Sequence, residues 1–200
     1  ISCGHNLVKL AIHAEQKDSS PTQIPGTTWS MVDTNYSTAH AIKTDGTLWG
    51  WGEGGFGNLA QNNQTDYSSP RQIPGTTWSK VVGGNQNFGA IKTDGTLWTW
   101  CSNGEGALGI NQPTNAHRSS PVQCSSQSNV IEAQFSIEQS YFVSGTSGFS
   151  VGKNNEGALG HNNQTNYSSP KQIPGSWKSL CGGVSKVGGG VRTNGTLWVW

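Results

Sequence analysis

The sequence predicts an all-β protein, a β-propeller built from repeated units of about 50 residues. The tripeptide Ser-Ser-Pro begins at Ser19, Ser68, Ser119 and Ser168, at spacings of 49, 51 and 49 residues. A segment that ends in Leu-Trp-x-Trp recurs at residues 42–51, 91–100 and 191–200. Short apolar runs alternate with turn signals, and none shows the period of a helix. A repeat of this length accommodates one four-stranded blade.

The unit is organised around the hairpin predicted at residues 91–100. Two short β-prone runs flank Asp94-Gly95, a pair that favours a type I′ turn. Alternation along the second run places Trp98 and Trp100 on the same face of the strand. We expect a neighbouring blade to cover this aromatic face.

The other strands of the unit follow in a fixed order. A polar Ser-Ser-Pro opening leads into an outer strand ending in Gln-Ile-Pro-Gly, and proline suits an edge strand because it cannot donate to a central ladder. An inner strand pair comes next, and the expected pairs lie near residues 1–12, 29–43, 78–92, 129–143 and 177–192 of a single domain spanning residues 1–200. The first unit has no room for a hairpin and a loop between Ile12 and Ser19. Both ends of the sequence fall inside a unit, which predicts a partial or incomplete ring.

Composition, charge and cysteine spacing limit the classes of function that fit this chain. The 28 glycines are about twice the average usage and fit a chain with many turns. Twelve basic and eleven acidic side chains are scattered along the chain, so no basic stripe exists for a nucleic acid partner. No apolar run approaches the roughly 20 residues of a membrane helix, and no leader opens the sequence, so we expect no membrane insertion. The four cysteines, Cys3, Cys101, Cys124 and Cys181, lack zinc-site spacing and are predicted to be small buried thiols.

The side chains that are candidates for catalysis or ligand binding are better explained by packing, turn geometry or exposure to solvent. All nine tryptophans occupy repeat positions, which favours packing between blades over an exposed carbohydrate platform. Asp45 and Asp94 align with Asn194, which keeps the turn and loses the carboxylate, so turn geometry explains them better than hydrolysis. Glu105 and Glu156 share a loop position that Phe56 holds in the earlier copy, and we interpret them as solvated. The five histidines share no repeat position or ligand spacing, so we predict no catalytic residue, no metal and no cofactor.

The candidate binding segments are two matching loops, QNNQTDY at residues 61–67 and HNNQTNY at residues 161–167, with a divergent counterpart at residues 111–117. Loops on a rigid scaffold commonly carry binding function, and amides with a tyrosine make adaptable contacts. The residues predicted to bind a partner are Asn62, Asn63, Gln64, Tyr67, Asn163, Gln164 and Tyr167.

The recurring order of A-I-K-T-D-G-T-L-W-x-W, G-x-L-G and S-S-P-x-Q-I-P-G resembles the repeat of the regulator of chromosome condensation (RCC1-like) family. The resemblance implies part of a seven-bladed β-propeller. The motif sequences are similar to those of bacterial or phage-encoded members of the family. One departure is that the family's inner-strand histidine is replaced by Leu7, Thr38, Asn87 and Lys186.

The function expected from these features is a non-enzymatic binding or scaffold module that presents loops to a protein partner. We expect it to belong to a larger extracellular or virion-associated protein. The name-giving family member is a guanine-nucleotide exchange factor for a small GTPase, so the resemblance implies that activity as an alternative. A third possibility is a module that binds surface glycans.

Overall fold

The computed structural model describes residues 21–112, 114–124, 127–183 and 186–200. Their fourteen strands are β1 (Trp29–Thr34), β2 (Thr38–Lys43), β3 (Leu48–Gly52), β4 (Tyr67–Ile73), β5 (Trp78–Gly83), β6 (Asn87–Lys92), β7 (Leu97–Cys101), β8 (Arg118–Gln123), β9 (Val130–Phe135), β10 (Gln139–Ser144), β11 (Ser147–Gly152), β12 (Tyr167–Gly182), β13 (Gly188–Arg192) and β14 (Leu197–Val199). Two single-turn 3-10 helices are η1 (Gly55–Gly57) and η2 (Gly104–Gly106). The inner strand pair expected near residues 1–12 lies outside the described residues.

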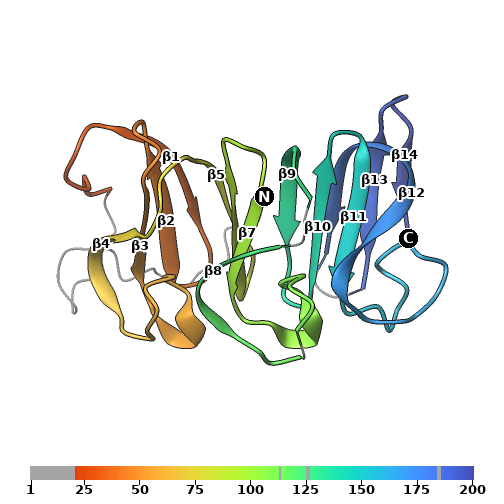
Figure 1. The fold of residues 1–200 in the computed structure, drawn as a ribbon, viewed down its shortest axis with the longest axis horizontal. Coiled ribbons are helices and arrows are strands. Elements are labelled where there is room, and N and C mark those ends of the chain that lie inside the picture. The colour runs from red at the N-terminus through yellow and green to blue at the C-terminus, as the bar shows by residue number, and fades with distance from the viewer. Residues whose placement is uncertain (1–20, 113, 125–126, 184–185) are drawn as a thin grey trace.

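The strands form a row of antiparallel blades (Figure 1). Blade 1 has the order β1-β2-β3-β4 and blade 2 the order β5-β6-β7-β8. The long strand β12 belongs to two blades, because its first part pairs with β11 up to Ser176 and its second part pairs with β13 from Trp177. Blade 3 is therefore β9, β10, β11 and the start of β12, and blade 4 is the end of β12 with β13 and β14. The predicted all-β propeller architecture is confirmed.

The hairpin turn differs from the predicted type. The Lys92 N–H donates to the Thr96 carbonyl (3.0 Å), and the Gly95 N–H donates to the Lys92 carbonyl (2.9 Å). Within this loop only Gly95 has a positive φ, +78°. A type I′ turn needs positive φ at both central residues, so that prediction is wrong. The loop is a type I turn closed by a glycine in the left-handed region.

The aspartate of the turn acts as a hydrogen-bond acceptor. Asp94 Oδ1 accepts bonds from the N–H (2.9 Å) and the hydroxyl (2.7 Å) of Thr96. Asn194 Oδ1 accepts the equivalent pair from Thr196, at 3.1 and 2.8 Å. An uncharged oxygen serves equally well, which supports the turn interpretation of these acids.

Blades pack face to face through their apolar sides. Between the first two blades, one buried cluster contains Ile42, Leu48 and Ile73 of blade 1 together with Trp78, Val81, Phe88 and Trp100 of blade 2. Trp100 is fully buried, and its Nε1–H donates to the Asn58 carbonyl of the preceding blade (2.9 Å). The second tryptophan of the hairpin is thus covered by a neighbouring blade, as the alternation predicted.

The first tryptophan of the hairpin lies at the rim instead. Trp98 is only half-buried, and its ring meets Trp78 edge-on, with centroids 6.2 Å apart. The Lys92 ammonium lies 4.2 Å from the Trp98 centroid and 4.8 Å from the Trp78 centroid. Lys43 and Arg192 hold the same place in blades 1 and 4. The expectation of burial between blades is wrong for this position, because Trp98 lies at the rim, where a cation and not a neighbouring blade covers the ring.

The cysteines fall into two groups. Cys101 and Cys124 are buried as expected, and burial raises the pKa of each thiol to about 12. Cys181 is exposed, so the expectation of a buried thiol is wrong there, because it lies on the outer flank of blade 4. Cys3 lies outside the described residues. In the part of the chain that the structure describes, no helix has the length and apolar character needed to cross a membrane.

Candidate functional site

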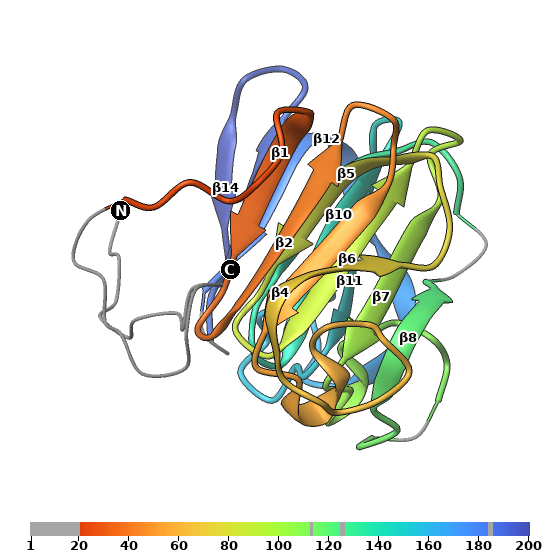
Figure 2. The ribbon, with the colours of Figure 1, turned by 90° about the vertical axis from the view of Figure 1, so that its left-hand side faces the viewer.

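Three long loops lie along one edge of the row of blades, which we call the loop face. They span residues 53–66, 102–117 and 153–166, and each connects the third strand of a blade to the fourth. Figure 1 shows them along the lower edge, opposite the hairpin turns, and Figure 2 shows the same edge from the blade 1 end. They share one edge because β3, β7 and β11 run in the same direction.

The first loop is held in shape by Asn63. Its Nδ2–H donates to the Gln61 carbonyl (3.2 Å) and to the Tyr67 hydroxyl (3.2 Å). Its Oδ1 accepts a bond from the Thr65 N–H (3.0 Å). The guanidinium of Arg71 lies 5.0 Å from the Tyr67 ring centroid. Asn63 and the Tyr67 hydroxyl therefore fix the conformation of the loop.

The third loop repeats this arrangement a hundred residues later. Asn163 Nδ2–H donates to the His161 carbonyl (3.1 Å) and the Tyr167 hydroxyl (3.1 Å), and its Oδ1 accepts a bond from the Thr165 N–H (2.9 Å). Asn154 Nδ2–H adds a bond to the Asn163 carbonyl (2.8 Å). The two matching sequences thus have matching loop structures.

The predicted binding residues consequently divide into two kinds. Asn63, Tyr67 and their twins Asn163 and Tyr167 use polar atoms inside the loops. The side chains of Asn62, Gln64 and Gln164 are exposed, and no hydrogen bond from them to another described residue is present. Asn62 has a φ of +57°, and its backbone N–H donates to the Ser119 carbonyl of blade 2 (2.7 Å). No bound molecule tests these residues, so their binding role stays a prediction.

The middle loop differs, and it contacts an aromatic residue that the sequence reasoning missed. Phe56 in η1 is 57% exposed, and its ring meets His117 edge-on with centroids 5.5 Å apart. His117 Nδ1 in turn accepts a bond from the Asn103 N–H (3.2 Å). The sequence signal was an aromatic residue at the position where the other two loops carry Glu105 and Glu156.

Carboxylates predominate around the loops of blades 2 and 3. Glu105 Oε2 accepts a bond from Asn166 Nδ2–H across the blade junction (3.0 Å). Lys153 forms an ion pair with Glu138 (2.9 Å), and the pKa of Lys153 is raised by Glu138 first and by Glu105 and Glu156 further away. One cation thus stands among three acids, which makes this part of the loop face unsuited to a phosphate backbone.

The candidate acids for hydrolysis lie at the opposite edge. The Thr47 hydroxyl and N–H lower the pKa of Asp45, and Thr96 does the same for Asp94. Both are therefore ionised turn residues rather than proton donors. Among the described residues, no group of three His, Cys, Asp or Glu side chains could hold a metal ion.

The blades and their loops define the protein as a repeat β-propeller. The family model for the regulator of chromosome condensation (RCC1) repeat matches residues 45–91 and 149–193. Each match begins in or near a hairpin and ends in the inner strands of the next blade. These two matches, which cover a little under half of the chain, support an RCC1-like family. No curated protein matched the sequence.

Three solved structures are similar to this fold. Prp20p from Saccharomyces cerevisiae, described with its binding to Gsp1p and histones, is 16% identical with a TM-score of 0.78, over 90% of this chain and 48% of its own. Human WBSCR16 is 19% identical with a TM-score of 0.78, over 99% of this chain and 54% of its own. A third structure holds yeast RCC1 (Prp20) bound to Kap60, at 17% identity and a TM-score of 0.76, over 90% of this chain and 46% of its own. The chain spans about half the length of these proteins.

Proposed function

We propose that this chain is a non-enzymatic binding module and that its loop face docks a protein partner. The observation that carries the proposal is the pair of loops at residues 61–67 and 161–167. In each loop, an asparagine and a tyrosine form a hydrogen bond with each other. A glutamine, Gln64 or Gln164, is exposed to solvent. Preorganised loops lose little conformational entropy on binding, which favours affinity.

The chemistry of the face favours a protein over other partners. It offers amide groups, the exposed ring of Phe56, and the carboxylates of Glu105 and Glu156. A protein surface with hydrogen-bonding groups and a few basic side chains would complement it. The neighbour Prp20p is described with protein partners, Gsp1p and histones, which supports the same class here. We place the module in a larger extracellular or virion-associated protein.

The test is a comparison of two variants as affinity baits. The double variant Gln64→Ala and Gln164→Ala removes the outward amides, and the control double variant Thr44→Ala and Thr93→Ala changes exposed residues at the turn edge. We expect a partner retained by the wild-type chain and the control, and bound at least tenfold more weakly by the loop variant, about 1.4 kcal/mol. Equal retention by all three chains would refute a loop-face site.

Nucleotide exchange is a separate activity with its own test. The three described loops are nearly equal in length, and none of them carries an outlying insertion that could enter a nucleotide site. We therefore expect the chain to leave the release of labelled GDP from small GTPases unchanged. Faster release of GDP in the presence of the chain would instead identify it as an exchange factor.

A glycan site is less well supported. The described tryptophans are buried, or lie at the rim under a cation such as Lys92, or border the flank of blade 4. None stands open on the loop face among the described residues. A glycan array with no bound sugar is the expected result.

A further inference from the structure

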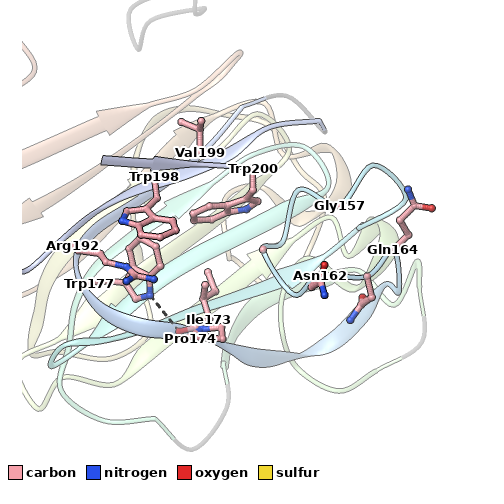
Figure 3. Close-up of a pocket in the computed structure, with 12 residues that line it drawn as sticks. Gly157, Asn162, Gln164, Ile173, Pro174, Trp177, Arg192, Trp198, Val199 and Trp200 are labelled. Carbon is pink, nitrogen blue, oxygen red and sulfur yellow. Dashed lines mark hydrogen bonds between the residues drawn. The ribbon is translucent and has the colours of Figure 1, made fainter. Parts of the chain in front are cut away.

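Aromatic rings near the surface of this protein are repeatedly covered by a cation. In blade 4 the Arg192 guanidinium lies 3.9 Å from the Trp198 centroid, and Figure 3 shows it beside the rings of Trp177 and Trp198. A positive charge over an aromatic ring is attracted by the electron density of the ring face. The pairs in the described residues are Lys43 with Trp29 and Trp49, Arg71 with Tyr67, Lys92 with Trp78 and Trp98, Lys171 with Tyr167, and Arg192 with Trp177 and Trp198. The same contact thus occurs in each of the four blades.

The ring of Phe56 is an exception on the loop face. It is 57% exposed, and no lysine or arginine of the described residues lies over it. Its edge-on contact with His117 does not bury it. Arg118, the cation of the neighbouring loop, instead donates to the carbonyls of Ala116 and His117. A single exposed ring is common on protein surfaces, so its backbone and its neighbours decide what it can bind.

The backbone holds the Phe56 ring on a fixed base. Phe56 has a φ of +59° within η1, a left-handed conformation that bulky residues rarely adopt. The turn is closed by a bond from the Gly57 N–H to the Gly54 carbonyl (2.9 Å). A Cβ at Gly57 would lie 2.4 Å from the Ser119 Cα, so the next blade leaves the turn little room to move. Residues held in such conformations cluster at binding sites, and a ring on a fixed base loses little freedom when a partner binds.

The other loops show that the fold does not require an aromatic residue here. Glu105 adopts the same conformation at the same turn position, with a φ of +55°, and Glu156 is its counterpart in the third loop. Glu105 contacts Asn166 of the following loop, just as Phe56 contacts His117. The position therefore links neighbouring loops with either kind of side chain. What the phenyl ring adds is the chemistry that it presents to solvent.

Two carboxylates flank the turn that carries Phe56. Asp66 Oδ1 accepts a bond from the Gly54 N–H (2.8 Å), and a Cβ at Gly55 would lie 3.8 Å from Glu53 Oε1. Both acids are exposed, and neither forms an ion pair with another described residue. A ring beside two unpaired carboxylates attracts a positively charged group.

We infer that Phe56 is the anchor of the loop face and that an arginine or lysine side chain of a protein partner lies over its ring. Glu53 and Asp66 pair with the charge of that side chain. The inference rests on the proposed function, because it names the group by which the partner is recognised. The site lies at the junction of blades 1 and 2, each of which has four described strands. Arginine fits better than lysine, since its planar guanidinium stacks on a ring and donates to carboxylates at the same time.

Peptide selection against the whole chain tests the contact. A phage-displayed library of random dodecapeptides is selected on the immobilised wild-type chain, and the retained peptides are synthesised and measured by isothermal titration calorimetry. We expect retained peptides to carry arginine or lysine. Replacement of that residue by glutamine should weaken binding about tenfold, because the contact with the ring and the pairing with the carboxylates are both lost.

Substitutions of Phe56 separate a cation contact from a purely apolar one. Phe56→Leu keeps an apolar side chain and removes the aromatic face, so it should weaken peptide binding about fivefold. Phe56→Trp presents a more attractive ring face and should bind the peptides at least as tightly as the wild-type chain. The control Thr93→Ala changes an exposed residue at the opposite edge and should leave binding unchanged. Urea unfolding of each variant checks that the fold is retained.

The variant Asp66→Asn tests the contribution of charge. Asn166 makes the equivalent bond to the Asn154 N–H in the third loop (2.7 Å), so an asparagine preserves the loop. Asp66→Asn should weaken peptide binding about threefold at low ionic strength and by less at high ionic strength, because salt screens exposed charges.

The possible outcomes distinguish this inference from the loop-face proposal. Equal peptide binding by the wild-type and Phe56→Leu chains, retained peptides without arginine or lysine, or no retained peptide would overturn the inference. Binding that is lost in the Gln64→Ala and Gln164→Ala variant but kept in the Phe56→Leu chain would overturn the inference alone and leave the loop-face proposal in place.

Discussion

His40 makes the stability of this protein depend on pH in a defined way. The imidazole is completely buried in β2, against the Phe88 ring (4.2 Å between centroids) and near the Trp100 ring (5.4 Å). Neither ring nitrogen makes a hydrogen bond of normal geometry with a described residue, and the poorly aligned Asn58 carbonyl offsets little of the cost of charging the ring. Burial lowers the pKa of His40 from 6.5 to about 3. The ring is therefore neutral in the folded protein at pH 7.

The sign of the effect follows from the two pKa values. Below pH 6.5 the unfolded chain binds a proton at His40, and the folded chain does not bind it until the pH approaches 3. The free energy of unfolding is therefore highest above pH 6.5 and falls as the pH is lowered. The two pKa values correspond to a loss of about 2 kcal/mol at pH 5 and about 3 kcal/mol at pH 4.

Urea unfolding followed by tryptophan fluorescence measures this loss at pH 7, 6, 5 and 4, at one protein concentration. The matched variant is His40→Gln, which is uncharged at every pH. Its buried amide lowers stability by about 1–3 kcal/mol at all pH values. We expect the wild-type curve to fall more steeply than the variant curve by about 2 kcal/mol between pH 7 and pH 5. Parallel curves would refute the argument that His40 stays neutral in the folded state.

Two further predictions concern the hairpins. Asp94→Asn should leave the melting temperature unchanged, because Asn194 makes the same two bonds in blade 4, and Asp94→Ala should lower it by about 2 °C; an equal loss in both variants would show that the charge itself matters. Lys92→Ala should reduce the free energy of unfolding by about 1 kcal/mol, because the cation between Trp78 and Trp98 is lost. Lys92→Arg should retain most of it, as Arg192 does in blade 4, and urea unfolding compares the two.

The strands of the fold were predictable because their signals are local. Alternating apolar residues and a turn pair define a hairpin within ten residues, and repetition along the chain identifies the blade. The turn type was not predictable from Asp94-Gly95 alone. An aspartate that bonds to the threonine two residues later stabilises the type I turn, in which only the glycine has a positive φ.

Burial was less predictable, because it depends on contacts between blades. Cys181 and Val82 hold the same repeat position, but only Val82 has a following blade packed on it in the described structure. Trp98 looks as apolar as Trp100 in the sequence, yet Lys92 covers it at the rim. No pattern within one unit distinguishes these environments.

The candidate site shows the same division. The similar sequences of residues 61–67 and 161–167 identified the loops, because similar sequences at the same position of a repeat adopt similar structures. It did not identify which side chains face outward. Asn63 is as polar as Gln64, but it lies where the Gln61 carbonyl and Tyr67 hydroxyl can accept its protons. Phe56 was missed because comparison with the other copies treated it as an exception.

One repeat position explains how blades that differ in sequence still pack alike. His40, Gly89 and Tyr141 lie in the same register of the second strand, opposite Asp33, Val82 and Gln134. At Gly89 the space for a side chain is taken by the Phe135 ring of the next blade.

At Tyr141 the ring extends the other way, over Gly182 of blade 4, and its hydroxyl donates to the Ala158 carbonyl (2.8 Å). Each junction therefore contains enough ring volume, supplied by either blade. The imidazole of His40 is the contribution of blade 1 to its own junction. The pKa of His40 is low because the ring fills that space and is buried there. The effect of a substitution at this position therefore also depends on the residue that faces it across the junction.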